Sequence, residues 1–318
     1  MSLVLTEETV AAWLVERGLA SSDQAAAAQI APLTGGVSAA VFAVRGPTIS
    51  LVVKQALAEL RVSDVWRARI ERTDTEVAAL RLCGELTPGA VPRVLEHDRE
   101  NHIAAIELLP DTSRNWQTEI AQGRVHADAA AWAGRTLGRW HRLTTGDETI
   151  AAAFADFESF VEQRLDPFHA TVERRLPELA PLVAPFRLEL TEHRVCFVDG
   201  DFAMKNIHVD PAGAAGPWAF DFEVAHYGNP LFDLGFFLSF VTLSAIRWPA
   251  LESELGRLRA GFLDAYRTEA PYADDPVAVA GHTACLILAR TDGTSPAAFL
   301  DEASREQARK TAIATLTG

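Results

Sequence analysis

The 318-residue chain has few cysteines and no long apolar run. Its three cysteines, Cys83, Cys196 and Cys285, are far apart and odd in number, so the sequence indicates neither a disulfide framework nor a thiolate metal site. No run of 18 apolar residues occurs, and no basic segment leads into an apolar stretch near the start. A membrane span and a secretory signal are therefore not predicted. We expect a cytoplasmic protein whose cysteines are reduced and buried.

Positive charge is also scarce. Lysine and arginine total 29 against 43 acidic residues, which gives a formal net charge of -14. Because nucleic acids and anionic membranes are bound by clustered lysines and arginines, neither is expected as a partner. The chain also lacks histidine pairs with zinc-site spacing and a Gly-x-Gly-x-x-Gly turn opening a helix. These absences argue against a zinc site and a dinucleotide-binding oxidoreductase.

Hydrophobic residues make up 48% of the chain and charged residues 23%, which is typical of a globular protein with a substantial core. The length exceeds that of a single small core and suits two lobes that share a cleft. We find no internal repeat and no low-complexity linker between the lobes.

The first third of the chain predicts a small antiparallel sheet. Thr6–Leu19 has apolar residues near helical spacing behind a Thr6 cap. Ile30–Ala56 follows as three β-branched runs broken by glycine turns. A helix is expected over about 73–86, with further strands near 93–95 and 103–108. Pro110 then interrupts the pattern.

The remainder of the chain predicts a larger, mainly helical lobe. We place the boundary so that residues 1–109 form a nucleotide-binding lobe and residues 110–318 form the lobe that carries catalysis and substrate recognition. The elements expected in this second lobe are a helix over 129–143, a helical stretch around 154–175, short strands at 194–198 and 218–220, and helices from 234 to the end.

Polar side chains converge on the loop between the two short strands. Val198–Ile207 contains Asp201 and Asn206, and Phe220–Glu223 contains Asp221. Phosphoryl transfer needs hard oxygen ligands for Mg²⁺ and a carboxylate that orients and deprotonates the attacking hydroxyl group. These residue types can supply both, whereas the structural alternative treats them as turn and capping residues.

The order Asp-x4-Asn, followed by an aspartate on the next strand turn, matches the catalytic loop and metal-binding turn of the protein-kinase-like fold. Asp199–Asn206 together with Phe220–Gly235 resembles the aminoglycoside phosphotransferase family and its relatives, choline kinase and methylthioribose kinase. The resemblance implies an α+β, two-lobed fold with a small antiparallel-sheet lobe. It also implies Asp201 as the catalytic base and Asn206 and Asp221 as Mg²⁺ ligands.

The first lobe contains candidate nucleotide-binding residues. Gly35, Gly36 and Ser38 lie between two expected strands, where a backbone without Cβ atoms can approach a phosphate. An ordinary hairpin turn is the alternative for the two glycines. The resemblance implies that Lys54 binds the α- and β-phosphates and that Glu76 on the next helix pairs with it.

Other candidates are assigned by position. In related kinases the hinge that contacts adenine corresponds to the backbone at Glu107 and Leu109. Lys205 is a candidate for contacting the phosphate or the acceptor, and Glu223 for a place near the metal or substrate.

Arg290 and Asp292 interrupt a C-terminal helical run and are candidates for contacting the acceptor, because the C-terminal helices shape that side of the cleft in this fold. A helix end held by an Arg–Asp pair explains them equally well. Asp233 corresponds to an aspartate that braces the catalytic loop, and we expect His141 to be a hydrogen-bonded packing residue.

Two positions depart from the family pattern. Asp199 stands where the catalytic loop usually begins with histidine, which adds a negative charge near other carboxylates. Ala39 stands where relatives often have a polar residue. We therefore carry two hypotheses. The first is a kinase that uses Mg²⁺ and ATP or GTP to phosphorylate a hydroxyl of an aminoglycoside, amino alcohol or sugar-like acceptor. The alternative is a nucleotide-binding pseudokinase with a regulatory role.

Overall fold

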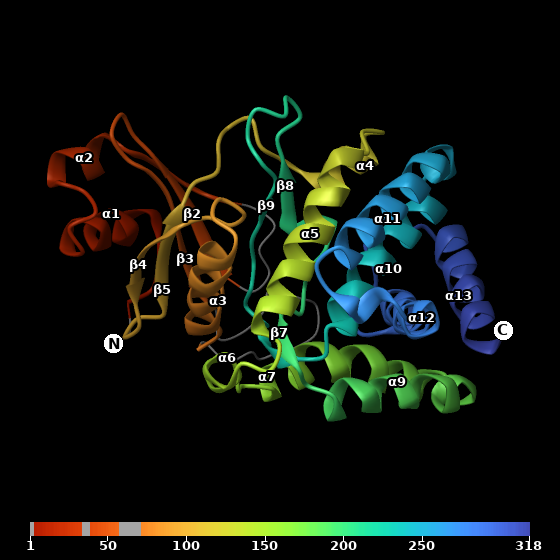
Figure 1. Cartoon of the computed structure of the whole chain (residues 1–318). Coiled ribbons are helices and arrows are strands. Elements are labelled where there is room, and N and C mark those ends of the chain that lie inside the picture. The colour runs from red at the N-terminus through yellow and green to blue at the C-terminus, as the bar shows by residue number, and fades with distance from the viewer. Residues whose placement is uncertain (1–2, 34–38, 57–70) are drawn as a thin grey trace.

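The structure, a computed structural model, describes residues 3–33, 39–56 and 71–318 (Figure 1). A five-stranded sheet in the order β1-β2-β3-β5-β4 dominates the first part of the chain, and every neighbouring pair is antiparallel. The expected sheet is therefore confirmed. The elements of this part are α1 (Glu7–Glu16), α2 (Ser22–Ala27), β1 (Gln29–Pro32), β2 (Ala39–Arg45), β3 (Ser50–Ala56), α3 (Arg72–Leu86), β4 (Val94–Asp98) and β5 (Ile103–Glu107).

Helices cover both faces of the sheet, with α1 on the outer side and α3 on the side of the helical lobe (Figure 1). Thr6 caps α1 through a capping box with Thr9, as the sequence predicts. The Trp13 indole N–H donates to the buried Asp98 carboxylate (3.0 Å), which Arg17 also contacts. Burial opposes ionisation of Asp98, but hydrogen bonds from groups that include Trp13 outweigh it and lower its pKa to about 2. These contacts tie α1 to β4.

Strand periodicity decides which way Lys54 points. Val53 is fully buried in the core that the sheet forms with α1. Successive side chains on a strand face opposite sides of the sheet, so the next residue, Lys54, faces α3. There its ammonium group meets Glu76. The alternation of β3 thus brings one cationic side chain toward the second lobe.

The rest of the chain is mainly helical and carries two small sheets, β7–β10 and β6–β8–β9. Most of the expected elements are present, and β6, β8 and β10 are additional strands that the sequence did not predict. This part also contains a π-helix (Val161–Ala170). Four 3₁₀ turns lie at Pro177–Leu179, Met204–Asn206, Pro249–Leu251 and Pro271–Ala273. The remaining elements are β6 (Arg114–Asn115), α4 (Trp116–Ala121), α5 (Ala127–Thr144), α6 (Glu148–Ala153), α7 (Glu158–Phe160), α8 (Thr171–Arg175), α9 (Ala180–Glu192), β7 (Cys196–Val198), β8 (Ile207–Val209), β9 (Trp218–Ala219), β10 (His226–Gly228), α10 (Leu231–Arg247), α11 (Glu252–Arg267), α12 (Pro276–Asp292) and α13 (Glu302–Thr317).

Helix α3 belongs to two cores. One side faces the sheet, while Ala79, Leu80 and Cys83 are buried in the large apolar cluster of the helical lobe. The three cysteines of the chain are free and buried, as expected. The α3 contacts join the sheet to the helices, and the lobe boundary at residues 109 and 110 stays a prediction.

No single helix in the described parts of the chain is long and apolar enough to span a membrane. The helices Leu231–Arg247 and Pro249–Arg267 are bent by 116° at the break between them. Only when they are taken as one pair do they reach the length and apolar composition of a span.

Glycine allows α5 and α11 to pack at close range. A Cβ atom on Gly134 would lie 2.1 Å from the carbonyl oxygen of Phe262, and one on Gly138 would lie 3.0 Å from that of Tyr266. Both clashes are with the α11 backbone, which cannot rotate away. The helix pair that supports the catalytic loop therefore depends on these two small residues.

We predict that Gly134→Ala lowers the free energy of unfolding by about 1–3 kcal/mol, the range for an overpacked core. Gly256→Ala is the matched control, because Gly256 is exposed on α11 with open space around it. Replacing a glycine in the middle of a helix with alanine should stabilise by roughly 0.5–1 kcal/mol. Denaturant unfolding of both variants checks the prediction, and equal effects would contradict the close packing of α5 and α11.

Candidate active site

The loop from Asp199 to Asn206 lies between β7 and β8 and carries the central candidate, Asp201. Its backbone turns at Gly200, where φ is +79°. A Cβ atom at this position would lie 2.8 Å from the carbonyl oxygen of Val224. Glycine is therefore required both by the left-handed conformation and by the close approach of the neighbouring chain. The turn directs Asp201 away from β7.

A buried carboxylate fixes the base of this loop. Asp233, at the start of α10, accepts hydrogen bonds from the backbone N–H groups of Asp199 (2.8 Å) and Gly200 (2.9 Å). His141 Nε2 lies 3.2 Å from the same carboxylate, and His141 Nδ1 lies 2.7 Å from the Tyr266 hydroxyl. The bracing role of Asp233 and the packing role of His141 are thus confirmed. Three helices, α5, α10 and α11, hold the loop in place.

The Asp201 carboxylate is buried and surrounded by hydrogen-bond donors. The Asn206 side-chain amide donates to Oδ2 (2.7 Å), and Lys205 Nζ contacts the same oxygen. Arg164 Nη2 lies 3.1 Å from Oδ1. Lys205 is the most exposed of the three partners, with 35% of its side chain accessible. It is therefore the partner that an incoming group can displace most easily.

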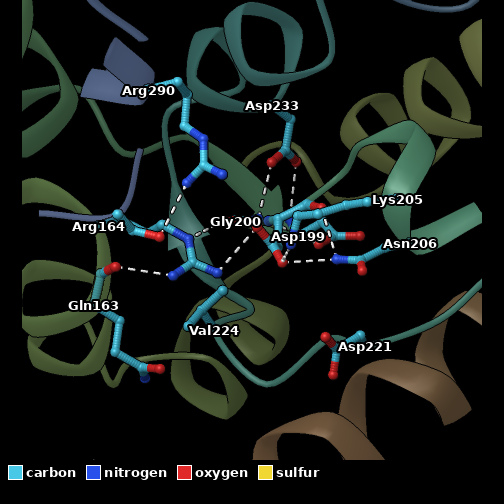
Figure 2. Close-up of polar contacts among 12 residues, drawn as sticks. Gln163, Arg164, Asp199, Gly200, Lys205, Asn206, Asp221, Val224, Asp233 and Arg290 are labelled. Atoms are coloured by element: carbon cyan, nitrogen blue, oxygen red, sulfur yellow. Dashed lines mark hydrogen bonds and ion pairs between the residues drawn. The ribbon is translucent and has the colours of Figure 1, made fainter. Parts of the chain in front are cut away.

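Asn206 and Asp221 lie near each other and present oxygen atoms (Figure 2). Because the Asn206 amide nitrogen donates to Asp201, its carbonyl oxygen points away from that carboxylate. Asp221 has a φ of 72°, a conformation that costs energy in a residue other than glycine and is common at ligand sites. An amide oxygen and a carboxylate suit Mg²⁺, which is usually bound by one or two carboxylates together with water and phosphate oxygens. The residues present therefore fit this ion.

Lys54 connects the two lobes. Its Nζ lies 2.9 Å from the Glu76 carboxylate on α3 and 2.7 Å from Asp221 Oδ1. Burial opposes the charge of Lys54, but Asp221 and Glu76 outweigh burial and raise its pKa above the usual value. Burial also opposes ionisation of Asp221, yet Lys54 and Lys205 hold its pKa below the usual value. The structure thus brings together a charged lysine and an ionised aspartate from the two sides.

Glu223 has a partner that the sequence did not reveal. The Arg72 Nε atom donates to the Glu223 carboxylate (3.1 Å), and the Arg72 side chain is 1% exposed. This contact links the first residue of α3 to the loop after β9. Glu223 is therefore close to the other candidates, but its charge is already neutralised.

Candidates near the nucleotide side differ in how far the structure describes them. Gly35, Gly36 and Ser38 lie outside the described residues. The Glu107 N–H donates to the Arg93 carbonyl (2.8 Å), so this group is not available to a ligand. Leu109 follows two residues after the end of β5, and its backbone N–H has no partner within residues 3–33, 39–56 and 71–318.

The structure separates Arg290 from Asp292. Both Nε (2.9 Å) and Nη2 (2.5 Å) of Arg309, on α13, bind the Asp292 carboxylate. Arg290 instead lies near Arg164 and Gly200 (Figure 2). The alternative explanation, a helix end held by a pair between Arg290 and Asp292, is wrong, because α13 supplies the partner of Asp292. We leave Asp292 out of the candidate site.

Arg164 was missed by the sequence analysis. Its Nε donates to the Gly200 carbonyl (2.8 Å) and its Nη1 to the Gln163 carbonyl (2.8 Å). The residue lies in a π-helix that contains Pro167, and π-helical turns are frequent at functional sites. The sequence does contain a signal that could have identified Arg164, because this arginine is flanked by Phe160, Leu165 and Phe168. A charged residue within an apolar stretch needs a buried partner.

Comparison with known proteins places these features in a family. Residues 29–282 match the model of the phosphotransferase enzyme family, APH. A methylthioribose kinase of Bacillus cereus (strain ZK / E33L) is 25% identical over 311 residues, with 82% of this chain and 77% of the relative covered.

Solved structures support the fold. A choline/ethanolamine kinase family protein from Mesorhizobium loti matches with a TM-score of 0.56 and 15% identity, covering 98% of this chain and 95% of its own. The streptomycin–ATP–APH(2")-IIa ternary complex matches with a TM-score of 0.53 and 13% identity, covering 98% and 97%. The fold is the expected α+β, protein-kinase-like one. Because the family match spans most of its length, this chain belongs to the phosphotransferase enzyme family.

Proposed function

We propose that this protein is a small-molecule kinase that transfers the γ-phosphoryl group of Mg-ATP to a hydroxyl group of a small acceptor. One observation carries the proposal. Lys54 from the sheet meets Asp221 from the helical lobe at 2.7 Å, beside the loop that carries Asp201 and Asn206. These are the residue types that bind a triphosphate, a metal ion and a hydroxyl group in phosphoryl transfer.

Lys54 is the proposed phosphate ligand. Glu76 holds its ammonium group at 2.9 Å, which fixes the direction of a long side chain with many rotamers. When the nucleotide binds, the α- and β-phosphates offer Lys54 negative charge in addition to that of Asp221. The adenine edge then lies at the hinge near Leu109. ATP is the favoured nucleotide, because it is the one present in the solved APH(2")-IIa complex.

Asp201 is the proposed base. The acceptor hydroxyl donates its proton to the Asp201 carboxylate as its oxygen bonds to the γ-phosphorus, and the bond from that phosphorus to the β-phosphate oxygen breaks to release ADP. Asn206 and Arg164 keep the carboxylate in one orientation. Lys205 moves aside for the hydroxyl, and its ammonium group is then free to contact the transferred phosphoryl group.

Asn206 and Asp221 are the proposed Mg²⁺ ligands. Bound there, the ion would neutralise charge on the β- and γ-phosphate oxygens. The hydrogen bond from the Asn206 amide to Asp201 leaves its carbonyl oxygen for this purpose. Lys54 keeps Asp221 ionised, as a metal ligand must be.

Asp199 motivates the pseudokinase alternative, and its contacts argue for an intact loop. Its Oδ1 accepts the Asp201 N–H (2.9 Å), so the aspartate still supports the loop where relatives have histidine. Burial, Asp233 and Asp201 raise the pKa of Asp199 well above the ordinary value. The surroundings thus oppose a charge on Asp199, and the loop keeps the hydrogen bond from Asp201.

We predict that Asp201→Asn lowers the rate of phosphoryl transfer by a factor of about 10²–10⁴, the range for losing a general base, while ATP binding is kept. The amide occupies the same space but cannot accept the hydroxyl proton. Steady-state ADP release and an ATP thermal-shift titration measure the two effects. Asp264→Asn is the control, since Asp264 is exposed on α11. Parental rates in Asp201→Asn would sink the proposed mechanism.

Asp221→Asn should abolish the Mg²⁺-dependent part of ATP binding. Saturation at 100 times the dissociation constant stabilises a protein by about 2.7 kcal/mol, and this gain should disappear in the variant. The measurement is thermal unfolding with ATP, with and without Mg²⁺. Binding of ATP without turnover of any acceptor would instead favour the pseudokinase alternative.

Asp199→Asn should stabilise the protein at neutral pH. Because the folded-state pKa of Asp199 is raised, the folded chain binds more protons than the unfolded chain, and stability falls as pH rises above the unfolded-state pKa of about 3.8. Asparagine removes this penalty and keeps the oxygen that accepts from Asp201. The melting temperature should exceed that of the parent at pH 7.5, and the difference should shrink toward pH 4. A constant difference across this range would contradict the buried-charge explanation.

A further inference from the structure

Arg290 lies in the last turn of α12, beside the acceptor side of the catalytic loop. Figure 2 shows its guanidinium group directed toward Arg164 and Gly200. The group lies over the rings of Phe168 (5.9 Å to the centroid) and Phe240 (5.4 Å). These aromatic contacts fix where the planar group sits.

Most hydrogen-bond donors of Arg290 are unused. Nη1 donates to Ser295 Oγ at 3.3 Å, which is long for a hydrogen bond to a charged group. Nε is buried and has no partner among the described residues. A buried donor without a partner is costly, and arginine can offer five N–H groups to a planar anion. Stacking and the nearby helix end favour the charge, but neither supplies an acceptor for these N–H groups.

Two other cationic side chains contact the Asp201 carboxylate, with which Arg290 also interacts. Arg164 and Lys205 share the carboxylate of Asp201. Burial lowers the pKa of Arg290 to about 10, Asp201 opposes this shift, and Arg164 adds to it. Arg290 is thus charged at neutral pH and lies close enough to interact with both residues. No carboxylate is paired with Arg290 in the described parts of the chain.

Two of the acidic residues considered as contacts for the acceptor, Glu223 and Asp292, are already paired. Arg72 binds Glu223, and Arg309 binds Asp292. A cationic amino alcohol or aminoglycoside would therefore meet neutralised carboxylates and free guanidinium donors. An acceptor with a negative charge would instead meet the unused N–H donors of Arg290.

We propose that the acceptor is an alcohol that also carries an anionic oxygen group, a carboxylate or a phosphate, and that Arg290 binds this group. The inference rests on the proposed function, since it assumes that the acceptor hydroxyl lies at Asp201. The unused N–H groups of the guanidinium group donate hydrogen bonds to the anion. This second contact orients the molecule so that its hydroxyl group faces the base.

The test uses four small molecules that share a vicinal diol and differ in the group at the other end, which is neutral, anionic or cationic: glycerol, glycerate, glycerol 3-phosphate and 3-amino-1,2-propanediol. The full-length protein is first saturated with Mg²⁺ and a non-hydrolysable ATP analogue, which keeps anions out of the phosphate site. Each diol is then titrated by thermal shift. These molecules test only the contact with the Arg290 guanidinium group. The natural acceptor can therefore be larger than any of them.

We expect glycerate or glycerol 3-phosphate to bind at least tenfold more tightly than glycerol and the amine, and the better of the two identifies the carboxylate or the phosphate as the anion. Arg290→Gln should weaken that binding roughly 10- to 100-fold, as for a lost charge-assisted hydrogen bond. Arg290→Lys should keep part of that binding. This result would show that the loss in Arg290→Gln does not come from misfolding. Arg257→Gln, an exposed arginine on α11, is the control for the change in net charge.

Two failures can be told apart. If the ATP analogue with Mg²⁺ does not stabilise the parent, the proposed function fails. If the analogue stabilises it but the anions bind no better than glycerol, or bind equally to Arg290→Gln and the parent, the anionic acceptor is ruled out and the kinase proposal stands.

Discussion

The carboxylate of Asp233 is the contact on which the geometry of the site depends. It is fully buried, and a buried carboxylate is tolerated only when donors surround it. Two of these donors are consecutive backbone N–H groups of the catalytic loop. The loop therefore cannot shift without leaving the carboxylate unsatisfied. His141 and Tyr266 extend the same network into α5 and α11, so the packing of these helices controls the position of Asp201.

A second constraint joins the two lobes. Lys54 contacts carboxylates from both sides, and α3 packs into the core of the helical lobe. Arg72 adds a further link through Glu223. These contacts hold Lys54 and Glu76 against the loop that carries Asp201. Pre-organisation of this kind reduces the entropy that is lost when the reacting groups are brought together.

The pairing of charged side chains differs between the residues around Lys54 and those around Arg290. Lys54 has the carboxylates of Glu76 and Asp221 beside it, and Arg72 has that of Glu223. Around Asp201, by contrast, Arg164 and Lys205 contact the carboxylate directly, and Arg290 keeps a buried N–H donor that has no partner among the described residues. The overall acidity of the chain therefore gives no indication of the local charge at the site.

Most of the architecture could be predicted from the sequence. The three strands before Ala56, the capped first helix and the helix that carries Glu76 were recognised because spacing and turn residues are local signals. The order of Asp201, Asn206 and Asp221 was sufficient to predict a shared site. The strands β6, β8 and β10 were missed because each is only two or three residues long and includes polar residues or glycine, whereas the equally short β7 and β9 lie in apolar runs.

The sequence by itself determined the fold class, the family resemblance and the residue types of the catalytic loop, because these depend on short-range order along the chain. The resemblance also implied the pair of Lys54 and Glu76, but only the tertiary structure decided the partners of most other charged side chains. Arg309 rather than Arg290 binds Asp292, and Arg164 reaches Gly200 across 36 positions. Such pairs form between segments that folding brings together, so no spacing in the sequence predicts them.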